Sequence, residues 1–172
     1  PIAHDGGTAI GLARYAWFQH SKDISGEPLS TLYLSVAPDY AKIESIKQKV
    51  SIMDIIDATH DDIEELIEQG NIVALFQGPA EGGPRALGNR SILFDPRHPD
   101  GKDIVNRVKR REWFRPFAGS CLEEHANEWF DMAGMESSPF MMYAVAVHAD
   151  KAPLIPAVTH VDNTCRVQTV NP

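Results

Sequence analysis

The sequence predicts an α/β (α+β) fold in which a twisted mixed sheet is flanked by helices. Short apolar runs of strand length alternate along the chain with segments whose apolar residues recur at helical spacing. This interleaving is typical of a sheet covered by helices. With 172 residues, of which 43% are hydrophobic and 23% charged, the chain is long enough to bury the core of one such domain.

In the N-terminal half, helical and extended segments follow one another with a linker between them. Residues 5–18 predict a glycine-rich turn leading into an apolar helix, and the polar residues 19–30 predict a linker. Residues 31–36 alternate and predict a strand, and residues 38–50 predict a helix opened by a proline. Residues 59–70 predict a further helix, with a capping-box-like start and a glycine at its end.

The C-terminal half alternates in the same way. Residues 71–77 form a short apolar run that predicts a central strand, and they lead directly into a loop rich in Gly and Arg. Further along, the apolar spacing predicts strands at 91–94, 140–147 and 165–170 and helices at 100–111 and 123–132.

Basic residues concentrate in one window of an otherwise acidic chain. Residues 85–115 hold nine of the 16 Lys and Arg but only four Asp and Glu, a net charge of +5, whereas the rest of the chain carries −13. Cations close to glycines, an Asn and a Ser indicate a binding site for a polyanion, and phosphate is the favoured ligand. The overall charge of −8 argues against general binding of nucleic acids or membranes.

Other sequence signals favour a cytoplasmic protein. No apolar run approaches the roughly 18–20 residues of a membrane-spanning helix, and no signal peptide is visible. Cys121 and Cys165 fit no zinc motif, so we expect both thiols to be reduced. The chain begins with Pro1 and stops just after an alternating stretch, so we expect it to be a piece of a longer protein.

Residues 82–91, called the Gly/Arg loop below, carry the clearest chemistry. Glycine permits close backbone approach and positive φ, so we expect backbone amides of this loop to face a ligand oxygen. Arg85 and Arg90 offer planar forks for phosphate, and Asn89 and Ser91 add neutral donors. The stretch lacks the ending of a Walker A loop and is no dinucleotide fingerprint. The alternative interpretation is a tight turn with solvated arginines.

Residues 109–117 form a second candidate, in which Lys109, Arg111 and Arg115 stand beside aromatic side chains. This composition suits stacking on a base, and it also suits RNA. The alternative is a solvated basic helix end next to a hydrophobic anchor, since cations favour helix C-termini. Glu112 is as well suited to orienting a neighbouring Arg as to acting as a base.

Residues 160–169 form a third candidate. Alternate residues of a strand share a face, which puts Thr164, Arg166 and Gln168 on one side and Cys165, Val167 and Thr169 on the other. A polar face with a lone Arg is typical of a site wall, and the alternative is an amphipathic edge strand. His160 and Asp162 lack the further ligands of a metal site, which favours a hydrogen-bonded structural role for His160.

Asp5 stands in a glycine-rich turn. A carboxylate flanked by glycines can reach a metal or a phosphate, but plain turn chemistry is commoner. No Ser-His-Asp or Cys-His arrangement follows from the spacing of the remaining candidates.

Three of these stretches occur together, in this order, in a known family. They are Gly-Pro-Arg-Ala-Leu-Gly-Asn-Arg-Ser-Ile-Leu at 83–93, Lys-Arg-Arg-Glu-Trp-Phe-Arg-Pro-Phe-Ala at 109–118, and His-Val-Asp-Asn-Thr-Cys-Arg-Val-Gln-Thr-Val at 160–170. On these motifs, residues 30–170 resemble the C-terminal part of the O-carbamoyltransferases of nodulation-factor and antibiotic biosynthesis. The departures from the family's usual residues, which bear on pocket shape and nucleotide preference, are Pro79, Gly82, Gly119, Asn163 and Cys165.

The resemblance implies a domain organisation. Residues 31–172 would form a YrdC-like domain, similar to threonylcarbamoyl-adenylate synthases and incomplete at its C-terminus. Residues 1–20 would be the tail of an N-terminal actin/sugar-kinase-like domain, and residues 21–30 a linker. In the family that N-terminal domain holds a metal ion; the residue matching Asp5 is one ligand, and the others would lie upstream.

The same resemblance implies an activity. The protein would bind ATP and carbamoyl phosphate, form carbamoyl-adenylate, and transfer the carbamoyl group to a hydroxyl of a small-molecule acceptor. We expect Mg²⁺ to accompany ATP, no nucleic-acid or membrane partner, and no activity from this chain alone; a homodimer stays open. Two alternatives also stay open: a threonylcarbamoyl-adenylate synthase-like domain for tRNA modification, and an RNA-binding module.

Joining two anionic substrates concentrates negative charge, so fixed cations should supply most of the stabilisation, with little acid–base chemistry. The expected catalytic residues are Arg85, Lys109 and Arg115. The expected substrate- and nucleotide-binding residues are Asn89, Arg90, Ser91, Arg111, Thr164 and Arg166.

Overall fold

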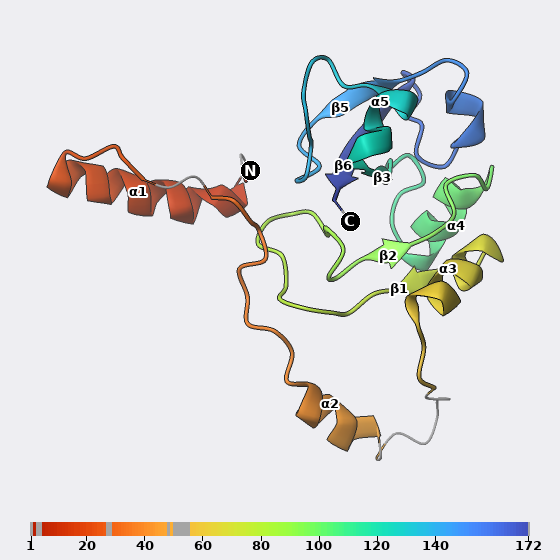
Figure 1. Ribbon diagram of the computed structural model, residues 1–172, viewed down its shortest axis with the longest axis horizontal. Helices are drawn as coiled ribbons and strands as arrows, with labels where there is room; N and C mark the ends of the chain where they lie inside the picture. The colour runs from red at the N-terminus through yellow and green to blue at the C-terminus, as the bar shows by residue number, and fades with distance from the viewer. Residues whose placement is uncertain (1, 3–4, 27–28, 48, 50–55, 172) are drawn as a thin grey trace.

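The computed structural model describes residues 2, 5–26, 29–47, 49 and 56–171, and it confirms the predicted combination of helices with a mixed sheet (Figure 1). The strands form two sheets, one of four strands in the order β3-β6-β5-β4 and one of two strands, β1 and β2. Within the described ranges, no helix has the length and apolar character needed to cross a lipid bilayer.

The four-stranded sheet is built around β6. Its strands are β3 (Ala118–Leu122), β4 (Phe130–Asp131), β5 (Ala144–Val147) and β6 (Thr164–Val170). β6 pairs in parallel with β3 and antiparallel with β5, which pairs in turn with β4. The sequence does not predict β3, because its Ala, Gly and Ser residues have low strand propensity. Pairing along the whole of β3 with β6 makes it a strand.

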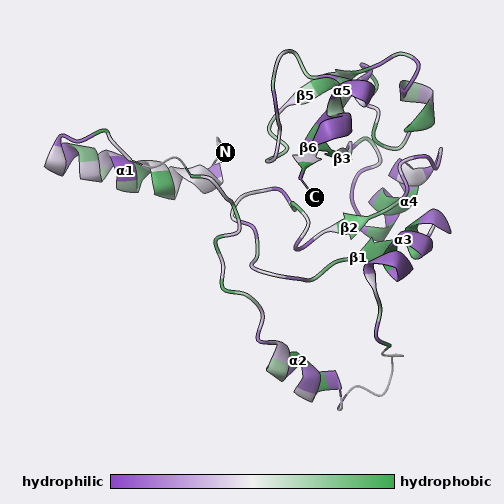
Figure 2. Cartoon of the chain, in the orientation of Figure 1, coloured by the Kyte–Doolittle hydropathy of each residue, from purple (hydrophilic) through white to green (hydrophobic). Residues whose placement is uncertain are grey.

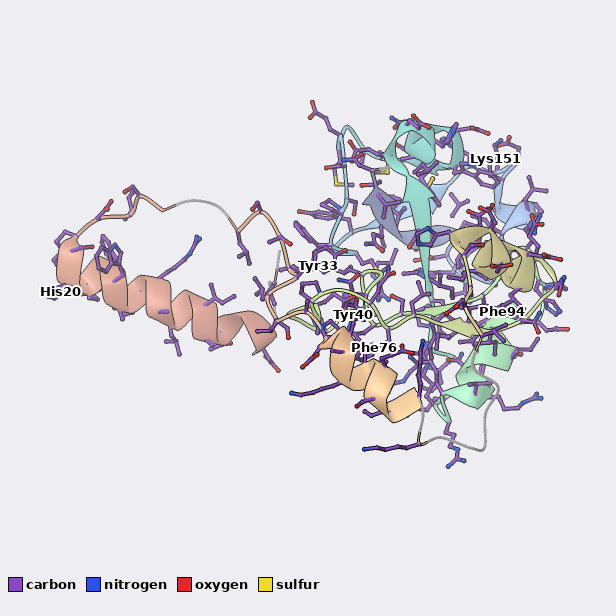
Figure 3. The ribbon with its side chains drawn as sticks, turned by 60° about the horizontal axis from the view of Figure 1, so that its bottom comes forward. His20, Tyr33, Tyr40, Phe76, Phe94 and Lys151 are labelled. Carbon is purple, nitrogen blue, oxygen red and sulfur yellow. The ribbon has the colours of Figure 1, made fainter. Side chains whose placement is uncertain are left out.

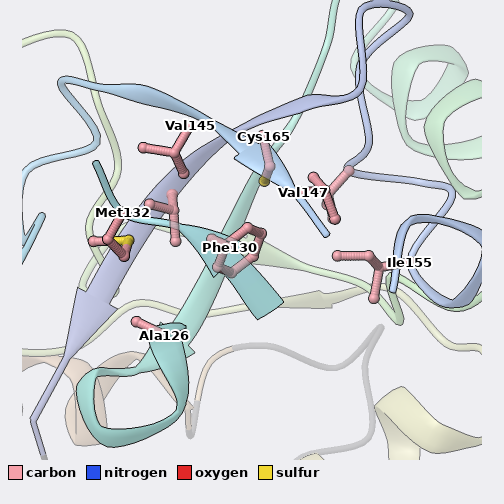
Figure 4. Close-up of a cluster of buried hydrophobic side chains, with 9 residues drawn as sticks. Ala126, Phe130, Met132, Val145, Val147, Ile155 and Cys165 are labelled. Atoms are coloured by element: carbon pink, nitrogen blue, oxygen red, sulfur yellow. The ribbon is translucent and has the colours of Figure 1, made fainter. Parts of the chain in front are cut away.

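The hydrophobic core lies on one face of this sheet. Cys165 and Val167 of β6 are fully buried there, packed with Phe130, Met132 and Val145. Figure 4 shows side chains of this cluster converging from β4, β5, β6 and α5 (Ala126–Trp129). The predicted alternation of β6 is therefore confirmed, and its opposite face is left for polar residues.

The second sheet is a short antiparallel hairpin. β1 (Val73–Ala74) pairs with β2 (Ile92–Leu93), and the Gly/Arg loop lies between them. Beyond the two strands the backbone stays paired, because Leu75 N donates to Ser91 O (2.7 Å) and Gln77 N to Asn89 O (3.0 Å). The hairpin packs beside α3 (His60–Glu68) and α4 (Gly101–Val108), which lie near one another in Figure 1. The predicted capping box of α3 is confirmed between Thr59 and Asp62.

Two predicted elements differ from the structure. Residues 31–36 are not a strand, and only an isolated bridge joins Tyr33 to Glu81. The predicted helix 123–132 is split into a 3-10 turn (Glu123–His125) and the short α5, because residues 130–131 pair with β5 instead. Tertiary pairing decides both cases, and neither is visible in local periodicity.

Several boundaries are shorter than predicted. The strands predicted at 71–77 and 140–147 are limited to β1 and β5, and α4 ends at Val108. Helix α2 (Tyr40–Lys47) falls inside the predicted range 38–50, of which residues 48 and 50 lie outside the described residues.

The predicted N-terminal helix is confirmed as α1 (Thr8–Ser21), preceded by a 3-10 turn at Asp5–Gly7. α1 runs away from both sheets in Figure 1 and buries none of its residues. Leu12, Tyr15 and Trp17 are all more than half exposed, and Figure 2 shows hydrophobic and hydrophilic residues interspersed along it. The domain boundaries expected at residues 20 and 30 stay predictions.

Candidate anion-binding site

A cavity of about 490 Å³ lies where the Gly/Arg loop meets the polar face of β6. Its walls come from the loop, from the chain after α4, and from strands β2, β3 and β6. Six predicted site residues line it: Arg85, Arg90, Ser91, Lys109, Arg111 and Arg166. Among the described residues of the lining there are five cations and no carboxylate, so the cavity favours an anion strongly.

The buried Nε atoms of Arg85 and Arg166 are the clearest indication of an anion-binding site. The Nε atom of each is buried, and within the described chain neither donates to a protein atom. Burial lowers the pKa of Arg166, and the positive charges of Arg85 and Arg111 lower it further. Buried donors without acceptors are costly in a protein interior. An anion between these arginines would satisfy the donors and relieve the repulsion.

Arg111 is held in place from several sides. Its Nε donates to the Oδ1 of Asn106, and its guanidinium lies 4.3 Å from the centre of the Phe117 ring. Asn106 is almost fully buried, and its Nδ2 donates to the carbonyls of Trp113 (3.1 Å) and Arg115 (3.0 Å). Burial lowers the pKa of Arg111, and the charge of Arg115 adds to this effect. Such a fixed cation needs little reorganisation when an anion arrives.

Arg90 is partly committed to the fold. Its Nη1 donates to the carbonyl of Gln77 (2.6 Å) and to that of Asn89 (2.9 Å), and its guanidinium lies 3.8 Å from the centre of the Phe76 ring. Phe76, and Tyr40 whose hydroxyl accepts from Gly78 N (3.1 Å), can be followed in Figure 3. Arg90 therefore ties the loop to the segment that follows β1, and its role as a substrate contact stays a prediction.

The amides of the Gly/Arg loop are used differently from the prediction. The backbone N–H groups of Leu87, Asn89 and Arg90 donate to the carboxylate of Glu81, and that of Gly88 donates to Ser91 Oγ. For these four amides the expectation of facing a ligand oxygen is wrong, because Glu81 or Ser91 already accepts from them. For the rest of the loop it stays a prediction. Side chains rather than these amides form the cationic lining.

Three other predicted residues lie outside the lining. The Asn89 side chain donates to the carbonyl of Pro79 (2.7 Å), and Arg115 Nε donates to Glu112 (2.6 Å). Thr164 Oγ1 lies 2.7 Å from Asp162 Oδ1 and 3.0 Å from His160 Nδ1. Their roles stay predictions.

His160 and the cysteines take structural positions. The His160 Nε2 lies 3.1 Å from the carbonyl of Phe117, so the hydrogen-bonded role predicted for this ring is confirmed. Cys121 and Cys165 are both free, as predicted. Burial raises the pKa of Cys165 to about 11, so its thiol stays neutral at physiological pH.

Asp5 lies in the 3-10 turn before α1 and is exposed. In the part of the chain that the structure describes, no three His, Cys, Asp or Glu side chains gather as metal ligands do. The expected metal role of Asp5 stays a prediction.

Gln168, which the sequence places on the polar wall face of β6, and Ser120 were not among the predicted binding residues. Gln168 is 4% exposed, accepts from Ser120 Oγ (3.1 Å) and donates to the carbonyl of Leu87 (3.1 Å). The alternation of β6 places Gln168 on the face of Arg166, so a signal for it exists. Ser120 has none, because β3 is recognisable only from its pairing.

Comparisons with known proteins agree with the motifs. Residues 64–172 match the family described as "Carbamoyltransferase C-terminus". The chain is 41% identical over 183 residues to nodulation protein NolNO of Sinorhizobium fredii, which covers 99% of the chain and 26% of that relative. It is 39% identical over 181 residues to nodulation protein NolO of Bradyrhizobium diazoefficiens, covering 99% of the chain and 32% of the relative. The chain thus spans about a quarter to a third of the length of these relatives.

Proposed function

Because the chain belongs to the carbamoyltransferase C-terminal family, we propose that it is part of an enzyme that activates carbamoyl phosphate with ATP and transfers the carbamoyl group to a hydroxyl. In this proposal the cationic cavity holds the phosphate groups of both substrates. The acceptor is a small molecule, and nucleic acids and membranes are not partners.

One observation carries the proposal. Five cations and no carboxylate are found among the described lining residues, and two of the guanidinium groups have buried Nε atoms without an acceptor. Arginine pairs with phosphate through two parallel hydrogen bonds. Two substrates that each carry phosphate would supply the oxygens that Arg85 and Arg166 lack.

The proposed reaction, from carbamoyl phosphate and ATP to the carbamoylated acceptor, requires little proton transfer by the protein. Water cleaves carbamoyl phosphate to carbamate and phosphate; a carbamate oxygen attacks the α-phosphorus of ATP and pyrophosphate leaves. The acceptor oxygen then attacks the carbamoyl carbon of carbamoyl-adenylate, AMP leaves, and the hydroxyl proton passes to solvent. In each step Arg85, Arg111 and Arg166 would neutralise charge that builds up on phosphate oxygens, which is the main demand of phosphoryl transfer.

The lining does not suit a protein-bound Mg²⁺. That ion prefers carboxylate and water oxygens, and the described residues around the cavity provide no carboxylate. We therefore assign no step to a metal held by this chain and expect Mg²⁺ to arrive with ATP as part of the substrate.

Calorimetric titration of the protein with ATP, carbamoyl phosphate, pyrophosphate and a short RNA at two salt concentrations tests the proposal. We expect the three phosphate compounds to bind, and Arg85→Ala to weaken them by about 100-fold because charged contacts of this kind are worth about 2–4 kcal/mol. RNA binding with a steep salt dependence and no binding of ATP would instead support the RNA-binding alternative. Adenylate formation from threonine and bicarbonate would support the threonylcarbamoyl alternative.

A further inference from the structure

The carboxylate of Glu81 lies at the centre of the Gly/Arg loop without lining the cavity. We propose that Glu81 is the positioning residue of the anion site: its charge shapes the loop so that Arg85 is held towards the cavity. This inference rests on the proposed function, because it assigns the loop's arginine to phosphate binding.

The backbone of Glu81 is fixed first. It forms an isolated bridge with Tyr33, and on either side Ser35 N donates to Ala80 O (3.3 Å) and Gly82 N donates to Leu32 O (2.7 Å). Leu32 is 3% exposed. The residue that carries the carboxylate is thus anchored beside buried Leu32, in a segment that lies outside the loop.

A single carboxylate oxygen of Glu81 then accepts hydrogen bonds from several backbone amides of the loop. Its Oε1 accepts from the backbone N–H groups of Leu87 (2.8 Å), Asn89 (2.8 Å) and Arg90 (3.2 Å). Burial opposes ionisation of Glu81, but these amide donors outweigh it, and the net effect is a lowered pKa. The side chain is therefore ionised at neutral pH, and hydrogen bonds to an ionised acceptor are stronger than neutral ones.

The hydrogen bond between Glu81 and Leu87 closes a ring of chain that contains Arg85. The carbonyl of Leu87 in this ring accepts from Gln168 Nε2 (3.1 Å), which belongs to the cavity wall, and from Tyr33 Oη (2.8 Å), which does not. The turn at Gly88 has φ of +120°, a conformation that an L side chain rarely adopts. Glu81 supplies the interactions that hold this turn closed.

Among the described residues, the carboxylate of Glu81 forms hydrogen bonds with backbone N–H groups and not with the arginine side chains of the cavity. It accepts from three amides, and it is absent from the residues that line the cavity. A carboxylate placed against the arginines would have neutralised them, whereas this arrangement shapes the loop and leaves the cavity cationic. The role is therefore positioning rather than contact with substrate.

The test compares Glu81→Gln with Glu64→Gln, a matched loss of one negative charge on an exposed face of α3. Without ligand, we expect amide hydrogen exchange at Leu87, Asn89 and Arg90 to become at least about tenfold faster in Glu81→Gln, since charge-assisted hydrogen bonds are weakened. Exchange in β6 should not change. We expect pyrophosphate affinity to fall about tenfold in Glu81→Gln and to stay at the wild-type value in Glu64→Gln.

Rescue separates positioning from a general loss of stability. In Glu81→Ala, formate or acetate should enter the space left by the carboxylate and restore part of the pyrophosphate affinity. If the variants do not fold, the wild type still decides, because protection of the three amides should be lost on acidification through the lowered pKa of Glu81. Tyr33, the titratable neighbour, has its pKa raised by burial and by Glu81 and stays neutral there.

Unchanged amide protection and pyrophosphate affinity in a folded Glu81→Gln protein would overturn the inference, as would protection that survives acidification. If the wild type binds none of the phosphate compounds, the proposed function fails instead. The exchange experiment needs no ligand, so the two failures can be told apart.

Discussion

The two faces of strand β6 show how this protein separates stability from binding. On one face, Cys165 and Val167 are fully buried in an apolar cluster. On the other, Arg166 and Gln168 line a cavity that is rich in cations. The first face is filled by apolar packing, whereas on the second a buried Nε of Arg166 has no acceptor among the residues that the structure describes. The core face is complete in the free protein, whereas we propose that an anion completes the cavity face.

The largest effect is expected on the core face. Val167→Asp would place a carboxylate where the side chain is 0% exposed and surrounded by apolar residues. We expect it to lower the free energy of unfolding by about 4 kcal/mol or more, since a buried unpaired charge is among the most destabilising changes. Urea denaturation measures it. A folded Val167→Asp protein of near wild-type stability would show that this face is not the core.

The matched change on the cavity face should act on binding. We expect Arg166→Gln to weaken pyrophosphate by about 100-fold, because it removes a charged contact in a partly buried site. Its stability should be equal to or higher than that of the wild type. The pKa of Arg166 is lowered, first by burial and then by Arg85 and Arg111, so the folded state disfavours its charge. Calorimetry and urea denaturation measure the two effects. A marked loss of stability with unchanged affinity would contradict the comparison.

Gln168 lies on the cavity face, and its side-chain amide both accepts and donates a hydrogen bond. We therefore expect its replacement to lower both stability and anion affinity, each by a moderate amount. Gln168→Leu removes the bonds to Ser120 and to the carbonyl of Leu87. The free energy of unfolding should fall by about 1–2 kcal/mol because buried polar partners are left unsatisfied. Anion affinity should fall less than in Arg166→Gln. Thermal unfolding with and without pyrophosphate checks both, and an effect as large as that of Val167→Asp would place Gln168 in the core.

The smallest effect is expected at Arg115. The sequence predicts a catalytic role, but its guanidinium is paired with Glu112 and lies outside the cavity lining. Both side chains are about half exposed, so the pair should contribute little to stability. We expect Arg115→Ala to change pyrophosphate affinity by no more than about twofold. A loss as large as that of Arg166→Gln would restore the predicted role.

Much of the fold could be predicted because its pattern is local. The period-two alternation of β6, the capping box at Thr59 and the helical spacing of α4 are each carried by neighbouring residues. Strand β3 could not be predicted, because its composition does not favour a strand and the strand that pairs with it is distant in the sequence. The strand expected at 31–36 fails for the converse reason: its alternation has no neighbouring strand to pair with along its length.

The site follows the same division. Residue type and charge density identified the cations, and six of the predicted residues meet in one cavity. The role of Glu81 could not be predicted, because nothing in the sequence shows that its carboxylate accepts hydrogen bonds from the loop amides. Asn89 and Arg115 were selected for their chemistry, while the structure commits their side chains to Pro79 and Glu112.

The sequence by itself determined where the positive charge lies along the chain and which face of β6 carries Arg166, since composition and alternation are properties of neighbouring residues. The tertiary structure alone decided which donors stay free. Hydrogen bonds are short and directional. The pairing of Glu81 with the loop amides therefore depends on the tertiary structure, and so does the lack of an acceptor for the Nε atoms of Arg85 and Arg166 among the described residues.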